Sequence, residues 1–300
     1  MTPEAQAILE SWSAPLGLDA SLCIAALIYA VGWLRLRRVI PELISPWRLA
    51  AFLAGIFSLW IAIGSPLEAF DDVSLSVHMV QHLLLMSIAP PLILLSAPTL
   101  PLLQGLPRWM TRGIVAPVLR WGWVKGLGHI ITDPAICWLA AALALIGWHI
   151  PAVFELALRS DGWHKFEHTT FFGAGLLFWW PVVQPWPSTT RWPRWSTPLY
   201  LFCGSLPCDA LSGFLAFCDR VVYTSYLSAP QIFTTSPLQD QERAAALMWT
   251  SITIIFLVPA VIVTIQMLSP KYAPAAVRQS WAELNRIAGQ PLDLSKPEVN

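Results

Sequence analysis

The sequence contains few charged residues. Only 12% of its 300 residues are Asp, Glu, Lys or Arg, whereas 56% are hydrophobic, and the mean hydropathy is +0.58. The 18 basic and 18 acidic residues give a net charge of zero, which excludes the basic surface that nucleic-acid binding requires. So little charge cannot cover a soluble protein of this length. The composition therefore predicts a polytopic membrane protein.

Cysteine is also scarce, and its spacing is uninformative. The five cysteines form no CxxC pair and lie mostly in apolar segments, which excludes a zinc ribbon and a disulfide framework. The first 18 residues contain neither Lys nor Arg and so lack the basic region of a cleaved signal peptide. We expect residues 1–17 to form a short interfacial segment on the outer side of the membrane.

Apolar segments long enough to cross a bilayer, which takes about 20 residues of helix, occur seven times. The predicted spans are Leu18–Leu36, Trp47–Gly64, Ser74–Ala97, Pro134–Ile150, His164–Val183, Thr197–Phe217 and Ala244–Leu268. The stretch from Pro98 to Asp133 contains prolines and basic residues, so we expect an interfacial connection there. An eighth crossing over Gly113–Val124 stays open. The predicted fold is all-α, with a seven-helix domain over residues 18–268.

Basic residues are distributed unequally between the two sides of this predicted domain. Fourteen of the 18 Lys and Arg fall on one side and four on the other. Because cytoplasmic loops retain Lys and Arg, the N-terminus is expected outside and the C-terminus, with a tail over residues 269–300, in the cytoplasm. The predicted location is the bacterial plasma (inner) membrane, as a multi-pass protein in contact with the lipid bilayer.

Histidines gather on the outer side of this topology. The four-residue spacing of His78 and His82, and of His164 and His168, places each pair on one helix face. His149 ends the fourth span because Pro151 follows two residues later. Neutral imidazole binds copper, zinc and iron, so the five histidines together predict a metal or heme site. A single histidine at this depth is equally explained by an interfacial contact with lipid headgroups.

Other side chains near this depth are candidates for a supporting role. Glu167 can orient an imidazole by accepting its second N–H, or it can pair with Lys165 or Arg159 at the surface. The remaining candidates are Met79, Met248, Cys208, Asp209 and Asp240. Thioether and thiolate ligands favour Cu(I) over zinc, although each Met taken alone is better explained by core contacts. A deep carboxylate such as Asp209 requires a cavity, a polar partner or a hydrogen bond to a neighbouring helix.

Four motifs resemble one known family. They are His78-Met-Val-Gln-His82, Trp148-His149-Ile150-Pro151, His164-Lys-Phe-Glu167-His168, and Asp240-Gln241 followed by Met248-Trp249. In this order they resemble the CtaG-type (caa-type) cytochrome c oxidase assembly factors. The resemblance implies a role in maturing heme-copper oxidase by handling copper on the outer side of the membrane. It also implies family positions at His78, His82, His149, His164, His168 and Asp240.

The sequence therefore leads to one principal hypothesis and one alternative. The principal hypothesis is a non-enzymatic assembly factor that binds copper, as Cu(I), and whose partners are heme-copper oxidase subunits or other assembly factors. A homodimer stays open. The alternative is an electron-transfer protein that binds heme b between histidines of different helices. A transporter is disfavoured because ionisable residues concentrate on the outer side and only Asp209 lies deep.

Overall fold

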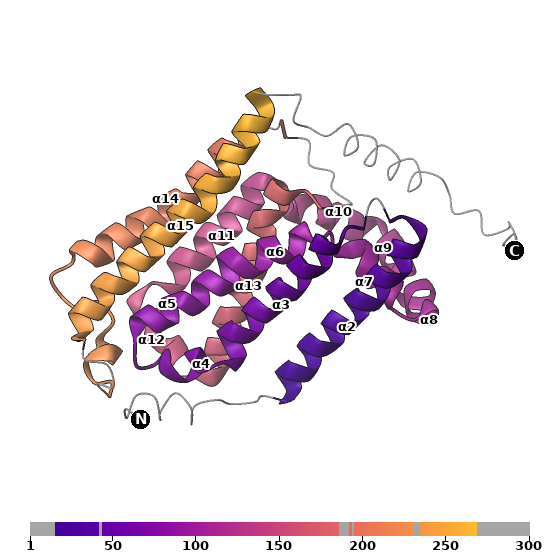
Figure 1. The fold of residues 1–300 in the computed structure, drawn as a ribbon. Coiled ribbons are helices and arrows are strands. Elements are labelled where there is room, and N and C mark those ends of the chain that lie inside the picture. The colour runs from indigo at the N-terminus through magenta and orange to yellow at the C-terminus, as the bar shows by residue number, and fades with distance from the viewer. Residues whose placement is uncertain (1–15, 42–43, 186–191, 194, 231–234, 269–300) are drawn as a thin grey trace, which may run out of the picture.

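The computed structural model describes residues 16–41, 44–185, 192–193, 195–230 and 235–268. Within these ranges every regular element is a helix, which confirms the all-α fold class (Figure 1). The predicted interfacial segment 1–17, except its last two residues, and the predicted tail 269–300 lie outside the described residues.

The helices follow one another with short connections. In chain order they are α2 (Leu16–Val39), α3 (Pro46–Gly64), α4 (Leu67–Phe70), α5 (Leu75–Leu83), the π-helix η1 (Leu84–Ile88), α6 (Ala89–Leu95), α7 (Thr99–Gly105), α8 (Arg108–Met110), the π-helix η2 (Thr111–Val115), α9 (Ala116–Arg120), α10 (Gly122–Ile131), α11 (Pro134–Trp148), α12 (Pro151–Leu158), α13 (Asp161–Val183), α14 (Ser196–Phe217), the 3-10 helix η3 (Thr224–Leu227) and α15 (Pro237–Leu268). Each of the seven predicted spans coincides with one long helix or, in the third, with α5, η1 and α6 in succession.

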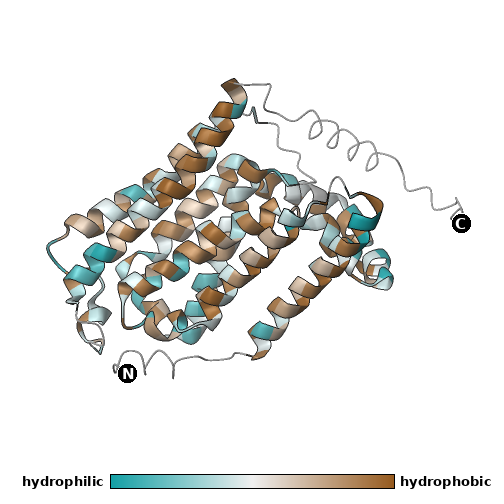
Figure 2. Ribbon diagram, viewed as in Figure 1, coloured by the Kyte–Doolittle hydropathy of each residue, from teal (hydrophilic) through white to brown (hydrophobic). Residues whose placement is uncertain are grey.

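Five of these segments are long and apolar enough to cross a membrane. They are Leu16–Val39, Pro46–Phe70, Leu75–Leu95, Ser196–Phe217 and Pro237–Leu268, and their ribbons are brown over most of their length in Figure 2. The described residues thus form a multi-pass membrane protein.

The other two predicted spans fall short of the same criteria for different reasons. The 15 residues of α11 extend only about 22 Å at 1.5 Å per residue, less than the apolar core of a bilayer, although α10 and α11 qualify jointly with a bend of 66° between them. Helix α13 has 23 residues, but its first two turns carry Asp161, Lys165 and Glu167. Between Gly113 and Val124, the chain leaves helical geometry at Trp121, which disfavours an eighth crossing.

Proline determines where the helices around the site begin and end. Pro134 and Pro151 occupy the first turn of α11 and α12, where the missing N–H breaks no hydrogen bond and the fixed φ suits the helix. Ile150 adopts extended geometry before Pro151, as proline requires of its predecessor. His149 consequently caps the C-terminus of α11, as predicted.

The third predicted span is not a uniform α-helix. After α5 the chain passes into η1, where the N–H of Ala89 donates to Leu84 O, five residues earlier. Pro90 and Pro91 follow directly, and their rings deprive the preceding turn of two N–H donors, so a wider turn relieves the clash. The π-helix also rotates the helix face that follows His82, and such insertions are frequent at functional sites.

One apolar core joins α3, α5, α6 and α11 to α13, α14 and α15. Helix α15 contacts α5 and α14 extensively but α6 hardly at all, so it diverges from α6 along its length (Figure 1). A groove of about 810 Å³ opens where they separate, lined by residues of η1, α6, the end of α13 and the last half of α15. We call this region the groove end, and the opposite region, where α5 and α13 begin, the histidine end.

Candidate metal centre

The five predicted histidines meet at the histidine end of the bundle. The His82 ring centroid lies 4.3 Å from that of His78, 5.9 Å from that of His149 and 6.1 Å from that of His168. The His164 centroid lies 4.2 Å from that of His168 and 5.7 Å from that of His78. All except His164 are buried. Three separate helices therefore bring these imidazoles to one place, as the spacing predicted.

Glu167 lies between the two histidines of α5. Its Oε1 atom is 3.4 Å from His82 Nε2 and 3.8 Å from His78 Nε2, and its side chain is fully buried. Arg159 pairs instead with Glu155, at 3.2 Å. The surface ion pair that the sequence left open for Glu167 is therefore wrong, because α13 turns this carboxylate into the bundle.

Two further carboxylates, which the sequence analysis did not select, complete the arrangement. Asp71 Oδ2 lies 3.1 Å from His164 Nε2, and Glu68 Oε2 lies 3.9 Å from His168 Nδ1. Both come from α4 and the turn that follows it. A signal was present in the sequence, because Glu68, Asp71 and Asp72 form an acidic run in a chain with little charge. We refer to the five histidines with Glu68, Asp71 and Glu167 as the histidine–carboxylate cluster.

Burial raises the pKa of the Asp71 carboxyl to about 8, and the neighbouring carboxylates of Asp72 and Glu68 add to the shift. In the absence of a cation, proton uptake is the ordinary way for such a site to reduce its charge. Metal binding reverses this preference because a ligand carboxylate must be deprotonated.

Many buried polar atoms of the cluster have no hydrogen-bond partner among the described residues. They are both ring nitrogens of His78 and His82, Nε2 of His164 and His168, both oxygens of Glu167, and Asp71 Oδ2. Buried polar groups are nearly always paired in native proteins, and exceptions mark a functional role or an unseen ion or water. Imidazole nitrogen and carboxylate oxygen together form a ligand set that fits copper or zinc. The residues present therefore fit a bound metal.

His149 is held in one tautomer. Its Nδ1 atom lies 2.7 Å from Leu145 O, which can only accept, so Nδ1 carries the proton and Nε2 keeps its lone pair. That Nε2 atom lies 3.5 Å from the sulfur of Met79. A hydrogen bond from the other ring nitrogen to a backbone carbonyl, such as that from Nδ1 to Leu145 O, is typical of metal-binding histidines. Met79 is thus the predicted soft ligand that the structure brings to the cluster.

The remaining predicted soft or deep side chains lie elsewhere. Cys208 contacts Ser212 on its own helix, at 3.8 Å, and Met248 lies in the apolar core. Neither Cys208 nor Asp209 belongs to a metal-binding group among the described residues. Asp209 Oδ1 is buried, and the polar partner predicted for it is missing within the described ranges.

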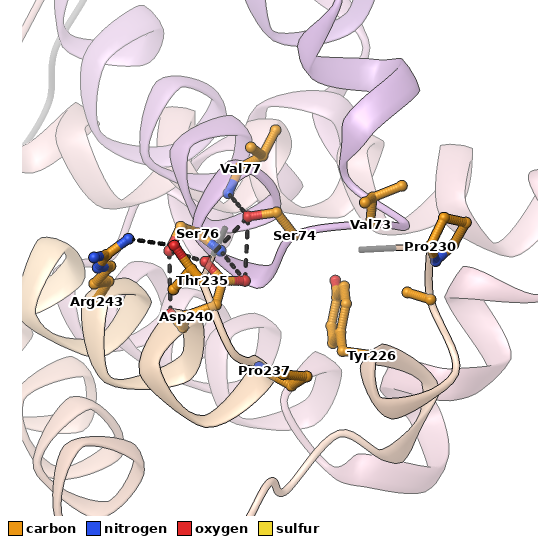
Figure 3. A pocket seen from close by; sticks show the side chains of 11 residues that line it. Val73, Ser74, Ser76, Val77, Tyr226, Pro230, Thr235, Pro237, Asp240 and Arg243 are labelled. Atoms are coloured by element: carbon orange, nitrogen blue, oxygen red, sulfur yellow. Dashed lines mark hydrogen bonds between the residues drawn. The ribbon is translucent and has the colours of Figure 1, made fainter. Parts of the chain in front are cut away.

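Asp240 has a structural role. Its carboxylate, from the first turn of α15, accepts hydrogen bonds from the N–H of Leu75 at 2.7 Å and from the Ser76 hydroxyl at 2.6 Å, the second of which is drawn in Figure 3. The Ser74 hydroxyl donates to it as well. An anion at a helix N-terminus satisfies free N–H groups and complements the helix dipole. Asp240 thus fixes the start of α5, one turn before His78.

Aromatic side chains enclose the cluster. Phe171 stacks on His82 with centroids 4.1 Å apart, and Phe154 lies 4.9 Å from His78. Two tyrosines near η3 bond to backbone carbonyls of cluster residues. Tyr223 donates to His149 O at 3.2 Å, and Tyr226 donates to Asp71 O at 2.8 Å. The segment around η3 therefore holds both ends of the cluster in place.

Gly175 lets α13 approach the third span closely. A β-carbon at this position would lie 2.6 Å from Met86 O and 2.8 Å from Pro90, closer than side chains tolerate. Since Glu167 and His168 lie two turns earlier on α13, this contact sets their distance from His78 and His82.

Comparisons with known proteins identify similar mycobacterial sequences. Uncharacterized protein Mb0105 of Mycobacterium bovis and uncharacterized protein MT0111 of Mycobacterium tuberculosis are each 25% identical over 272 residues, 87% of this chain and 40% of theirs. Uncharacterized protein ML1998 of Mycobacterium leprae is 24% identical over 268 residues, 84% of this chain and 38% of its own length. The chain thus spans about two fifths of these relatives. No solved structure matches it.

A family match covers the whole site. Residues 27–269, which include every member of the histidine–carboxylate cluster, match the family described as cytochrome c oxidase caa3 assembly factor (Caa3_CtaG). This match confirms the resemblance that the four sequence motifs indicated. The chain belongs to this family of cytochrome c oxidase assembly factors.

Proposed function

We propose that this protein binds copper, as Cu(I), in the histidine–carboxylate cluster and supplies it during the assembly of cytochrome c oxidase. The observation that carries the proposal is the set of buried imidazole nitrogens without partners, centred on His78 and His82. Copper is the cargo, and the oxidase or another assembly factor is the recipient. The protein catalyses no reaction in this scheme.

The proposed topology has seven spans, with the N-terminus outside and the cluster facing outward. The asymmetry of Lys and Arg supports it. It also explains why α13 fails a simple hydropathy test, because Glu167 points into the bundle and contacts histidines instead of lipid. A bacterial inner membrane location follows from this topology and from the role of the family in respiratory assembly.

Different residues of the cluster supply different groups to the proposed copper site. His78 and His82 present nitrogens from one face of α5, and Met79 and His149 lie beside them with a sulfur and a fixed nitrogen lone pair. Glu167 supplies a negative charge that offsets the charge of the ion. Phe154 and Phe171 keep water from the buried side. Cu(I) is favoured by the thioether and imidazole ligands.

Heme b is not favoured by this geometry. A porphyrin must lie between two opposing ligand rings, whereas the His78 ring stacks directly on that of His164, with centroids 5.7 Å apart, and Phe171 already stacks on His82. Bis-histidine ligation would require both aromatic contacts to open.

Metal analysis of the purified protein tests the proposal. Wild type loaded with Cu(I) under reducing conditions is expected to retain copper after desalting, and His78→Ala with His82→Ala is expected to lose it. His129→Ala is the matched control, because His129 lies far from the cluster in α10. Unchanged copper content in the double variant would overturn the site assignment. A Soret band in wild type expressed with sufficient heme would favour heme b.

A further inference from the structure

The cluster contains two sets of metal-binding side chains that share no residue. His78, His82 and Glu167 form one set, and Glu68, Asp71 and His168 form the other. In each set one ligand atom from every residue lies within 4.8 Å of the others. Because the sets share no residue, an ion in one set takes no ligand from the other.

The two sets differ in chemistry. The first offers two imidazoles and one carboxylate, with the Met79 sulfur close to the neighbouring His149. The second offers two carboxylates and one imidazole, a harder ligand set that suits divalent cations better than Cu(I). Two of its atoms, Asp71 Oδ2 and His168 Nε2, are buried and lack hydrogen-bond partners. Unpaired atoms thus occur in the second set as well as in the first.

Exposure decreases from the second set to the first. The side chain of Glu68 is 29% exposed, whereas those of His78 and Glu167 are 0% exposed. A third group, Asp71 with His78 and His164, takes one residue from each set, and the His164 side chain is 13% exposed. The ligand groups therefore form a continuous series from the surface to the buried histidines.

The charge of the cluster also favours more than one cation. Glu68, Asp71 and Glu167 bring three carboxylates together, and within the described ranges none forms an ion pair with Lys or Arg. Ligand carboxylates are deprotonated when a metal binds, and one monovalent copper ion then balances only one of the three negative charges.

We propose that Glu68, Asp71 and His168 form a second metal position, which binds a divalent cation and through which metal reaches His78, His82 and Glu167. The delivery of copper rests on the proposed function, whereas the second position itself does not. Glu68, as the most exposed ligand, is the first to meet an incoming ion.

Metal stoichiometry with two probes separates the positions. Metal-free protein in detergent is titrated with Zn(II) alone and, separately, with Cu(I) alone. Wild type is expected to bind two Zn(II), and both Glu68→Gln with Asp71→Asn and His78→Ala with His82→Ala are expected to bind one. With Cu(I), the carboxylate variant is expected to keep its final copper content and to load it more slowly. The control is Asp72→Asn, which changes an exposed neighbouring acid.

Each outcome discriminates between the two proposals. A single Zn(II) in wild type, unchanged by Glu68→Gln with Asp71→Asn, would overturn the second position and leave the copper site intact. Loss of one Zn(II) in that variant, in a protein that binds no Cu(I), would uphold the second position and reject the proposed function. Glu68→Gln alone, which removes only the most exposed ligand, is the test if the double variant does not fold.

Discussion

The histidine end and the groove end share helix α13 and lie at opposite ends of the third predicted span, yet they differ in polarity and in packing. At the histidine end, α5, α11 and α13 converge on buried polar atoms that lack partners. At the groove end, α6, α13 and α15 separate around mostly apolar side chains and leave about 810 Å³ between them. The difference shows that close side-chain contacts are concentrated around the histidine–carboxylate cluster, while the opposite end leaves a groove with mainly apolar walls.

The largest expected effect comes from removing the buried charge at the histidine end. Glu167→Gln keeps the shape of the side chain but removes its charge, so the affinity for copper in the proposed site should fall on the order of 100-fold, because losing even a carboxylate that only orients a ligand costs about 10- to 100-fold. Thermal stability should not fall, because an unpaired buried carboxylate is lost. Competition with a copper chelator and a thermal melt measure the two effects. Glu242→Gln, which changes an exposed acid of α15, is the control and should change neither.

The close approach of α13 can be broken without touching a ligand. Gly175→Ala forces a β-carbon against Met86 and Pro90, and overpacking of this kind costs about 1–3 kcal/mol. Copper affinity should fall as well, because Glu167 and His168 move with α13. Gly173→Ala lies half a turn away on the same helix, with nothing within 4 Å of the added carbon. Equal behaviour of the two variants in melting and chelator competition would refute the assigned role of Gly175.

Asp240 can be tested for two different roles, namely capping the start of α5 and binding the metal. Asp240→Ala removes the hydrogen bonds that cap α5, and loss of such a cap costs about 1 kcal/mol. The melting temperature should drop while copper stoichiometry stays at the wild-type value. Asp219→Ala, an exposed acid, serves as the control. Loss of copper from a folded Asp240→Ala variant would return this residue to the ligand set.

The smallest effect is expected at the groove end. Ile262 is 49% exposed and lines the groove, so Ile262→Phe adds apolar surface without a clash. Stability should change by less than about 0.5 kcal/mol, and copper affinity should not change. A large loss of copper affinity would show that the two ends are coupled.

The sequence predicted the histidine end in outline because helix periodicity and proline rules act locally. The four-residue spacing of His78 and His82 determines their common face, and Pro151 determines that α11 ends at His149. Hydropathy located the long helices for the same reason. Even so, the number of spans depends on α11, which is short, and on α13, which carries charged residues in its first turns. Whether these helices cross the membrane depends on the helices packed against them.

Other features depend on contacts between distant segments and could not be derived from spacing. Asp240 caps a helix that begins 165 residues earlier in the chain, and a motif match cannot distinguish that role from ligation. Glu68 and Asp71 reach His168 and His164 only because α4 and the turn after it lie over the start of α13. Conversely, Cys208 and Met248 carry sulfur atoms suited to Cu(I), but Cys208 contacts Ser212 on its own helix and Met248 lies in the apolar core.

The two tyrosine hydrogen bonds near η3 have a mechanical consequence. Tyr223 and Tyr226 belong to one short segment, yet they hold the backbone of His149 on one side and of Asp71 on the other. A displacement of this segment therefore moves the backbone of both residues at once and changes the spacing of the side chains in the histidine–carboxylate cluster.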